Sequence, residues 1–380
     1  MRKAIAFVMA GMLAVTAMTG CSKSGGATEA AATKAADTKA EAVKDSGKAS
    51  DITGKTVVFI PKLTGNAFFE SAGKGAQKYG KDWGINVDYQ GSPNAAVADQ
   101  VSVINNAVAS GVDAICVSSV DATGLDSALK EASAAGVTVV TWDSDVSNTA
   151  RTLMVSQGTP DILGKMLVDM GADSLTKRGK DIKADKIKYC WHYSQATVAD
   201  QNSWQAAGEA YIKENYPNWV NVAPDNYYSE QDAEKAVSIG ASILEANPDI
   251  DLIICNDSTA LPGQCKAAQN KGLTKENVTI TGFASPMSIK DYCNAGIIEQ
   301  WGLWDCQVQG AIGSYLAAYI AAGNQLKVGD KVDIPKIGTV EVLPNDCLVD
   351  GAPTGEVNNG VVLLPERTVF NKDNMNNYDF

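Results

Sequence analysis

The chain has 380 residues and a mass of 39.9 kDa, which exceeds one small core and suits two domains of ordinary size. Asp and Glu (44) outnumber Lys and Arg (32), so the formal charge is −12 and the pI is about 4.7. This balance argues against a nucleic-acid groove, because neutralising phosphates requires clustered Lys and Arg. The single histidine, His192, excludes a His-rich metal site, although a carboxylate site for a hard cation stays open.

The first part of the chain predicts a targeting segment followed by a linker. Basic residues precede an apolar run over residues 4–17, and small residues then lead to Cys21. This pattern resembles a bacterial lipoprotein signal. The resemblance implies that residues 1–20 are the signal peptide and that Cys21 becomes the lipidated first residue. The alternative is an ordinary signal peptide or a short membrane anchor. Residues 21–53 hold almost no large apolar side chain and are expected to form a flexible linker. We therefore expect the folded part, from about Gly54, on the extracytoplasmic face of the cell membrane, attached only through the lipid.

Cysteine usage gives little indication of the redox compartment. Besides Cys21 the chain has seven cysteines, an odd number, and no Cys-x-x-Cys spacing for zinc or redox chemistry occurs. Cys116 and Cys255 lie within apolar runs, which favours core packing for both. No disulfide is predicted.

From residue 54 onward, the hydrophobic pattern alternates between strand and helix. Continuous or alternating apolar runs predict strands at 56–60, 85–89, 114–117, 137–142, 187–191, 252–255 and 278–283. Helical spacing predicts helices at 68–79, 95–108, 125–134, 161–175, 203–214 and 233–246. The rhythm is typical of βαβ crossovers and restarts near residue 161, which predicts an α/β fold of two doubly wound lobes with parallel sheets.

The two lobes are expected to be discontinuous in sequence and joined by a hinge that the chain crosses several times. We predict crossings near residues 143–160, 283–287 and 301–306. The N-terminal lobe would comprise residues 54–146 plus 285–303, and the C-terminal lobe and tail residues 147–284 plus 304–380.

Polar residues gather where the predicted strands end. In a parallel sheet the carboxyl ends of the strands form one edge, and ligands bind there. Lys62 follows the first strand, Asp143 the fourth, and Asp200 with Gln201 follow the strand that ends near His192. Carboxylates accept hydrogen bonds from hydroxyls, Lys donates one, and aromatic faces cover C–H groups, so this set suits a small polyol. The other strand-end residues are Asn256, Asp257, Ser258, Trp304 and Asp305.

Each of these residues also has a plainer interpretation. Lys62 could be a solvated lysine at a strand end, and Asp143, Asp145 and Asp200 could cap helices or stabilise turns. The Asp-x-Asp spacing could ligate a divalent cation, but no third acidic residue is nearby in sequence, so neither a metal nor a cofactor is predicted. His192 is expected to pack at a strand end rather than to act in catalysis.

Catalytic motifs are missing from the sequence. Gly54-Lys55-Thr56 lacks the upstream glycine of a phosphate loop and precedes a strand instead of following one. No Gly-x-Ser-x-Gly elbow is present, so acyl transfer has no nucleophile signature. The sequence favours a binding protein over an enzyme; an enzyme on the same fold and a signalling receptor domain are the rival hypotheses.

Several stretches in a shared order carry a family resemblance over nearly the whole chain after Gly54. They are Phe59-Ile60-Pro61-Lys62, Thr141-Trp142-Asp143-Ser144-Asp145, Gln157-Gly158-Thr159-Pro160, Thr197-Val198-Ala199-Asp200-Gln201-Asn202, Gly302-Leu303-Trp304-Asp305, Val361-Val362-Leu363-Leu364-Pro365-Glu366-Arg367 and Tyr378-Asp379-Phe380. With the lipoprotein-like signal and the two α/β lobes, the chain resembles the type I periplasmic binding proteins, the solute receptors of ABC importers. The stretches themselves resemble the autoinducer-2-binding subgroup, which is close to rhamnose-binding receptors.

The resemblance implies a set of ligand-binding residues. Those expected to hydrogen-bond the hydroxyl groups of the ligand are Lys62, Asp143, Asp200 and Gln201. Phe68, Phe69 and Trp304 would line the pocket, and Asp305 would border it. The Pro-Asp-Ala segment of the family reads Asn256-Asp257-Ser258 here, and the hydrogen-bonding groups of Asn256 and Ser258 leave open whether the ligand is autoinducer-2, rhamnose or another monosaccharide.

The function implied by the resemblance is capture by hinge closure, without catalysis. A small polyhydroxylated ligand would bridge Lys62 and Asp143 on one lobe to Asp200 and Gln201 on the other, which favours the closed form. The closed receptor, expected to be a monomer, would deliver the ligand to the permease subunits of an ABC transporter. We expect no nucleic-acid partner and no membrane contact beyond the lipid anchor.

Overall fold

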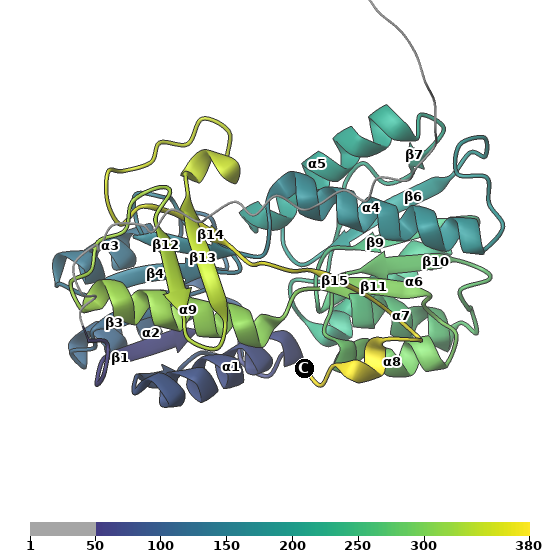
Figure 1. The fold of residues 1–380 in the computed structure, drawn as a ribbon. Helices are drawn as coiled ribbons and strands as arrows, with labels where there is room; N and C mark the ends of the chain where they lie inside the picture. Colours follow the sequence, from purple (N-terminus) through teal and green to yellow (C-terminus); the bar gives the residue numbers. More distant parts are fainter. Residues whose placement is uncertain (1–50) are drawn as a thin grey trace, which may run out of the picture. The chain divides into compact units, whose positions relative to one another are not determined.

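The computed structural model describes residues 51–380, which belong to one compact unit. The predicted signal peptide, Cys21 and nearly all of the predicted linker lie outside the described residues. Within residues 51–380, no helix combines the length and the apolarity that crossing a bilayer requires. Two large sheets organise this part of the chain (Figure 1).

The first sheet has eight strands in the order β12-β13-β14-β5-β4-β3-β1-β2. The neighbouring strands β14, β5, β4, β3, β1 and β2 pair in parallel. Strands β12 and β13 form a hairpin that pairs antiparallel with β14 at one edge of the sheet. The central strands are continuous apolar runs because helices cover both of their faces. The strands are β1 (Thr56–Ile60), β2 (Asn86–Tyr89), β3 (Ala114–Val117), β4 (Thr138–Trp142), β5 (Leu153–Ser156), β12 (Lys331–Ile334), β13 (Gly338–Leu343) and β14 (Gly360–Leu363).

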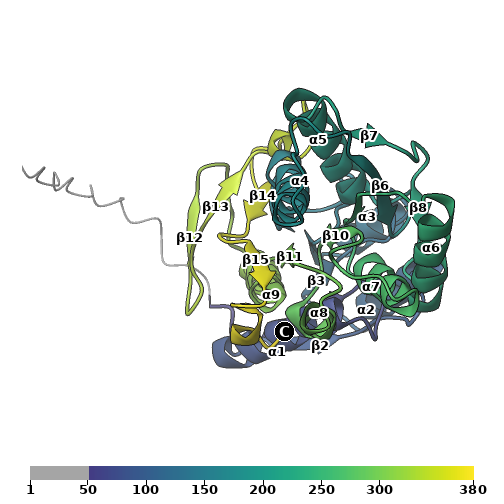
Figure 2. The same ribbon diagram turned by 90° about the vertical axis from the view of Figure 1, so that its right-hand side faces the viewer.

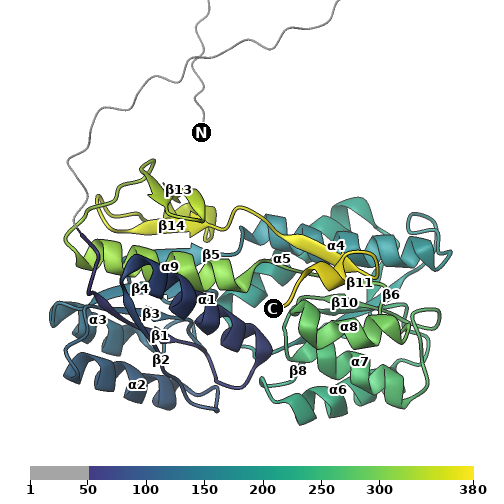
Figure 3. The ribbon, with the colours of Figure 1, turned by 60° about the horizontal axis from the view of Figure 1, so that its bottom comes forward.

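Four long helices cover this first sheet. One face carries α2 and α3, whose apolar side chains form a core cluster with β1, β3 and β4. The other face carries α1 and α9, which lie alongside each other (Figure 3). A Cβ atom at Gly310 would overlap the carbonyl oxygen of Ala72, so glycine is needed where these two helices meet. The helices are α1 (Ala67–Trp83), α2 (Val97–Ala109), α3 (Asp126–Ala134) and α9 (Cys306–Ala321).

The second sheet is parallel, with the order β10-β9-β6-β7 and with β8 also paired to β6. Helix α4 packs beside α5, and α6 packs beside α7 (Figure 2). A separate antiparallel pair, β11 with β15, lies next to β10. The strands are β6 (Lys188–Tyr193), β7 (Val220–Asn221), β8 (Tyr227–Tyr228), β9 (Leu252–Cys255), β10 (Thr279–Gly282), β11 (Gln300–Leu303) and β15 (Thr368–Asn371). The helices are α4 (Pro160–Lys177), α5 (Ala199–Asn215), α6 (Ala233–Ala246), α7 (Ala260–Asn270) and α8 (Pro286–Asn294), and short 3₁₀ turns occupy Asn345–Cys347 and Met375–Asn377.

The chain passes between the two sheets after β5, after β11 and after β14. The first two passages lie within the predicted crossings at 143–160 and 301–306. The predicted crossing at 283–287 is wrong, because Phe283 bridges Gly302 and α8 stays with the second sheet. The third crossing instead lies between Leu363 and Thr368.

The predicted lobe boundaries need correction for the same reason. Residues 285–303 belong with the second sheet rather than the first, since β11 contacts β10 and α4. Most of 304–363 belongs with the first sheet, because α9 buries its apolar surface against α1 and the strands β3, β4 and β5. We therefore call the part around the first sheet lobe 1 and the part around the second sheet lobe 2.

The cysteines of the described residues are free thiols. Cys116 and Cys255 are completely buried in strands β3 and β9, which confirms their predicted place in the core. Burial raises the pKa of both thiols well above its ordinary value, so neither is a reactive thiolate at neutral pH.

Candidate functional site

The carboxyl ends of the strands in both lobes face one small cavity. Lys62 lies just after β1 and Asp143 directly after β4, both in lobe 1. Asn256 directly follows β9, and Gln201 lies in the first turn of α5, both in lobe 2. The cavity volume is about 20 Å³, room for one water molecule. Its lining residues are Lys62, Phe68, Phe69, Asp143, Gln201, Trp204, Asn256, Asp257, Ser258, Phe283, Leu303 and Trp304.

The lobe 1 side of the cavity holds a buried ion pair. Lys62 Nζ lies 3.1 Å from Asp143 Oδ2, and these side chains are only 3% and 7% exposed. Ser118 Oγ donates a hydrogen bond of 2.7 Å to the same carboxylate oxygen. Burial opposes the charge of Lys62, but the carboxylates of Asp143 and Asp200 outweigh it, so the pKa of Lys62 lies above its ordinary value. The ammonium group is therefore a permanent donor at neutral pH.

Asp143 also has a left-handed backbone, with φ of 59°. Asp tolerates this region better than most residues. Gln157 Nε2 donates to the Asp143 carbonyl at 3.1 Å and helps to hold the turn. The carboxylate is thus aimed by the backbone as well as by its ion pair.

Asp200 lies beside the cavity rather than in its lining. Its Oδ1 accepts a hydrogen bond of 2.7 Å from Ser144 Oγ, which joins α5 of lobe 2 to the loop after β4 in lobe 1. Its Oδ2 is buried and has no hydrogen-bond partner within the described residues. Burial, aided by the charge of Asp143 and opposed by Lys62, raises the pKa of Asp200 to about 6.

The lobe 2 side of the cavity is a hydrogen-bonded chain around Gln201. Its Oε1 accepts from Ser194 Oγ at 2.8 Å, and its Nε2 donates to Asp257 Oδ2 at 3.5 Å. Asp257 also accepts from the backbone N–H groups of Thr259 and Ala260, while burial raises its pKa. Asn256 Nδ2 donates to the Gln201 carbonyl at 3.2 Å, but its Oδ1 is buried with no partner in the part of the chain described. Of the two buried acceptors without a partner, Asn256 Oδ1 belongs to the lining of this cavity and remains for a hydroxyl donor, whereas Asp200 Oδ2 lies beside the cavity.

Aromatic rings form the rest of the cavity wall. Phe68 and Phe69, at the start of α1, lie edge to face with centroids 5.1 Å apart. Trp304 lies edge to face with Phe68 at 5.8 Å, and its Nε1 donates to Gln309 Oε1 at 2.6 Å. Since the indole N–H is already paired, Trp304 offers mainly its apolar surface to the cavity. A site with charges and amides on one side and rings on the other suits a ligand with hydroxyl and C–H faces.

Most predicted site residues meet at this cavity, and two do not line it. Asp200 is adjacent to it, whereas Asp305 is exposed and accepts from Val308 N at 3.1 Å as the N-cap of α9. Trp204, Phe283 and Leu303 line the cavity without having been predicted there, and Asp257, noted in the sequence only as a strand-end residue, lines it as well. Two sequence features could have indicated these residues. Trp204 stands three residues after Gln201 and so shares its side of α5, and Asp257, Phe283 and Leu303 lie at or just after the ends of β9, β10 and β11.

Two other polar residues have structural roles. Asp145 Oδ2 pairs with Arg151 at 2.7 Å and its Oδ1 accepts from Thr141 Oγ1 at 2.6 Å, which supports the turn interpretation. His192 is completely buried in β6, with Nδ1 3.2 Å from Gln264 Oε1. Burial lowers the pKa of His192 to about 4, and its packing role is confirmed. Within residues 51–380, no three His, Cys, Asp or Glu side chains gather as metal ligands would.

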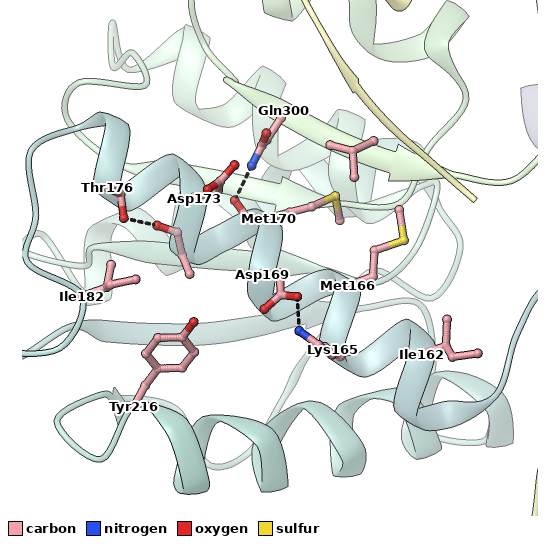
Figure 4. A pocket seen from close by; sticks show the side chains of 12 residues that line it. Ile162, Lys165, Met166, Asp169, Met170, Asp173, Thr176, Ile182, Tyr216 and Gln300 are labelled. Atoms are coloured by element: carbon pink, nitrogen blue, oxygen red, sulfur yellow. Dashed lines mark hydrogen bonds and ion pairs between the residues drawn. The ribbon is translucent and has the colours of Figure 1, made fainter. Parts of the chain in front are cut away.

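A larger pocket of about 690 Å³ lies elsewhere, on the outer side of α4 (Figure 4). Met166 and Met170 border it together with Tyr216 from the end of α5. Asp169 is paired with Lys165 on the same helix. None of the strand-end polar residues reaches this pocket, so it is not the candidate site despite its size.

Comparison with known proteins identifies the family. Residues 57–325, more than half of the chain, match the profile of the periplasmic binding protein domain. The chain belongs to the periplasmic binding protein family. The α/β fold with two parallel sheets and the predicted family are thereby confirmed.

Two solved structures and one curated relative show what this periplasmic binding protein is similar to. LsrB from Clostridium saccharobutylicum in complex with AI-2 is 70% identical, with a TM-score of 0.85, over 86% of this chain and 100% of that one. A solute-binding protein from Clostridium phytofermentas with bound L-rhamnose shares the fold at 22% identity and a TM-score of 0.74, over 86% and 98% of the two chains. The ribose import binding protein of Bacillus subtilis is 24% identical over 57% of this chain and 66% of its own length.

Proposed function

We propose that this periplasmic binding protein captures autoinducer-2 (AI-2) for an ABC transporter. The observation that carries the proposal is the cavity itself, where Lys62 and Asp143 face Gln201 and Asn256 and where the buried Asn256 Oδ1 has no hydrogen-bond partner within the described residues. The 70% identical relative in complex with AI-2 supports the choice of ligand.

Capture would proceed by closure of the two lobes. A cavity of about 20 Å³ is too small for a furanose ring, so the lobes must move apart to admit the ligand. The ligand then bridges lobe 1 through Lys62 and Asp143 and lobe 2 through Gln201 and Asn256, whose side chains line the cavity. Because only the closed form makes both sets of contacts, ligand binding favours closure.

The available contacts are sufficient for useful affinity. Two hydrogen bonds to charged groups contribute roughly 1.5–3 kcal/mol each and two to neutral amides roughly 0.5–1.5 kcal/mol each, so the four contribute roughly 4–9 kcal/mol. A micromolar dissociation constant corresponds to about 8 kcal/mol. Ordering of side chains and closure of the lobes consume part of the total.

A monosaccharide such as rhamnose is the second candidate ligand. The amide of Asn256 and the hydroxyl of Ser258 are hydrogen-bonding groups at positions where the resemblance implies Pro and Ala. An extra buried acceptor, Asn256 Oδ1, suits a ligand with one more hydroxyl group. The relative with bound L-rhamnose shares this fold.

The setting of this function is also a proposal. Lipid attached to Cys21 would hold the protein at the extracytoplasmic face of the membrane, next to the permease that receives the ligand. The protein would act as a monomer and would not turn its ligand over. Release of unchanged ligand after incubation with the purified protein tests the last point, and a new product would contradict it.

Titration calorimetry tests the proposed function directly. The protein should bind AI-2, and L-rhamnose and D-ribose in parallel show its preference. Asp143→Asn removes the counterion of Lys62 and a hydroxyl acceptor, and should weaken binding roughly 100-fold. Asp305→Asn is the matched control, because Asn keeps the helix cap outside the cavity, and it should bind as the wild type does. Unchanged affinity in Asp143→Asn would contradict the site.

Small molecules released from the denatured protein identify the natural ligand independently. Mass spectrometry with boron analysis distinguishes a sugar from AI-2 and from a borate ester. Finding only a ligand without vicinal hydroxyl groups would overturn the polyol assignment.

A further inference from the structure

A second cavity adjoins the ligand-binding cavity, and Trp204 is the one residue of the described chain that lines both. This outer cavity has a volume of about 220 Å³. The loops after β3 and β4, the crossing after β5, the segment near Leu348 and the start of α5 surround it. Trp204 therefore separates two spaces of very different size.

The two cavities also differ in chemistry. The ligand-binding cavity presents Lys62, Asp143 and Gln201, whereas the outer cavity is lined mainly by apolar groups. Val146, Met154 and Leu348 are examples of those apolar groups. Asp145 and Asp200 also border the outer cavity, but most of its exposed lining is apolar, so it suits a hydrocarbon chain better than a hydroxylated ring.

Trp204 is held in place by two neighbouring aromatic rings and by the packing of its helix. It is 4% exposed and lies edge to face with Phe283 and Trp304 at centroid distances of 5.8 and 6.1 Å. Helix α5 packs closely on α4, because a Cβ atom at Gly164 would lie 2.6 Å from the Gly208 nitrogen. The backbone of α5 is therefore in close contact with α4 directly behind this wall.

We propose that Trp204 is a specificity-determining residue that sets the upper size of the ligand by closing the binding cavity against the outer one. The proposal rests on the proposed function. A ligand with one alkyl end would direct its hydroxyl groups to Lys62 and Asp143 and its alkyl end to the aromatic side, where Trp204 stands. A longer alkyl end would meet the indole, and the space beyond would be out of reach.

Calorimetry with two ligands tests this role. The probes are 4,5-dihydroxypentane-2,3-dione, from which AI-2 forms, and its homologue with three more methylene groups at the methyl end. The wild type should bind the first and reject the second. Trp204→Leu should accept the homologue, gaining about fourfold per buried methylene or about 60-fold for three, while its affinity for the parent compound falls because an aromatic contact is lost.

Two further variants separate size selection from loosening of the structure. In the Trp204→Leu background, Ala122→Phe fills the outer cavity from lobe 1 and should abolish the gain for the homologue. Trp219→Phe removes a buried tryptophan that lies outside both cavity linings and should keep the wild-type preference. Trp204→Phe, a milder change, serves if Trp204→Leu unfolds at a lower temperature than the assay requires.

The possible failures are distinguishable. A wild type that binds neither probe contradicts the proposed function itself. A wild type that binds the parent compound, together with Trp204 variants that still reject the homologue, overturns the role of Trp204. A gain that persists in the Ala122→Phe double variant also overturns it, since the alkyl chain would then lie elsewhere.

Discussion

The charge of Asp200 should make stability depend on pH in a measurable way. Its pKa is raised from 3.8 to about 6 because the carboxylate is buried next to Asp143. A raised pKa means that the folded state prefers the protonated acid. The stabilising effect of that proton is therefore complete below pH 3.8 and is lost as the pH rises through about 6.

The size of the effect follows from the two pKa values. Between pH 8 and pH 5, a group with a pKa of 3.8 when unfolded and about 6 when folded favours the folded state by about a factor of 10. That factor corresponds to roughly 1 kcal/mol. Asp200→Asn keeps an oxygen to accept from Ser144 but cannot ionise, so the contribution disappears in the variant.

Urea unfolding at pH 8 and pH 5 measures the contribution. From pH 8 to pH 5, the unfolding free energy of the wild type should rise by roughly 1 kcal/mol more than that of Asp200→Asn. Titrating groups far from Asp200, including His192, affect both proteins equally and cancel in the comparison. Identical pH dependence in the two proteins would refute the argument that the cleft disfavours the Asp200 charge.

Two further predictions concern the contact between the lobes and the buried histidine. Ser144→Ala removes the hydroxyl that joins lobe 1 to Asp200, so ligand release measured by stopped-flow fluorescence should become about tenfold faster. Ser110→Ala, at the end of α2, is the control. Equal release rates in the two variants would count against the contact. Because burial lowers the pKa of His192 to about 4, its imidazole should stay neutral from pH 8 to 5.5 in a protein without a histidine tag. As the only histidine of the chain it gives one imidazole NMR signal, and titration of that signal near pH 6.5 would show that the ring is solvated.

Much of the fold was predictable because burial leaves a local pattern in the sequence. Strands β1 and β3 are buried on both faces and read as continuous apolar runs, so their predicted ranges match the structure. The short strand β5 was not predicted, because four residues are too few for the apolar periodicity to distinguish a strand from a loop. Helix α9 is apolar around nearly its whole circumference, and its lobe was assigned wrongly because its sequence does not reveal which partner buries it.

The site was predictable to a similar degree. Lys62, Asp143 and Asn256 stand within two residues of the ends of buried strands, and parallel strands bring such residues to one edge. Asp305 was placed at the cavity by resemblance, but its carboxylate caps α9. Trp204 escaped prediction because an aromatic residue at helical spacing is indistinguishable, in sequence, from one that packs in a core.

The sequence by itself determined the alternation of strands and helices and the identity of the polar groups at the strand ends, since both depend on neighbours within a few residues. The tertiary structure alone decided which lobe holds α9, which carboxylate of lobe 2 receives the Ser144 hydroxyl, and which ring divides the two cavities. Those outcomes depend on contacts between residues far apart in the chain, where a single glycine or hydroxyl group sets how closely two elements approach.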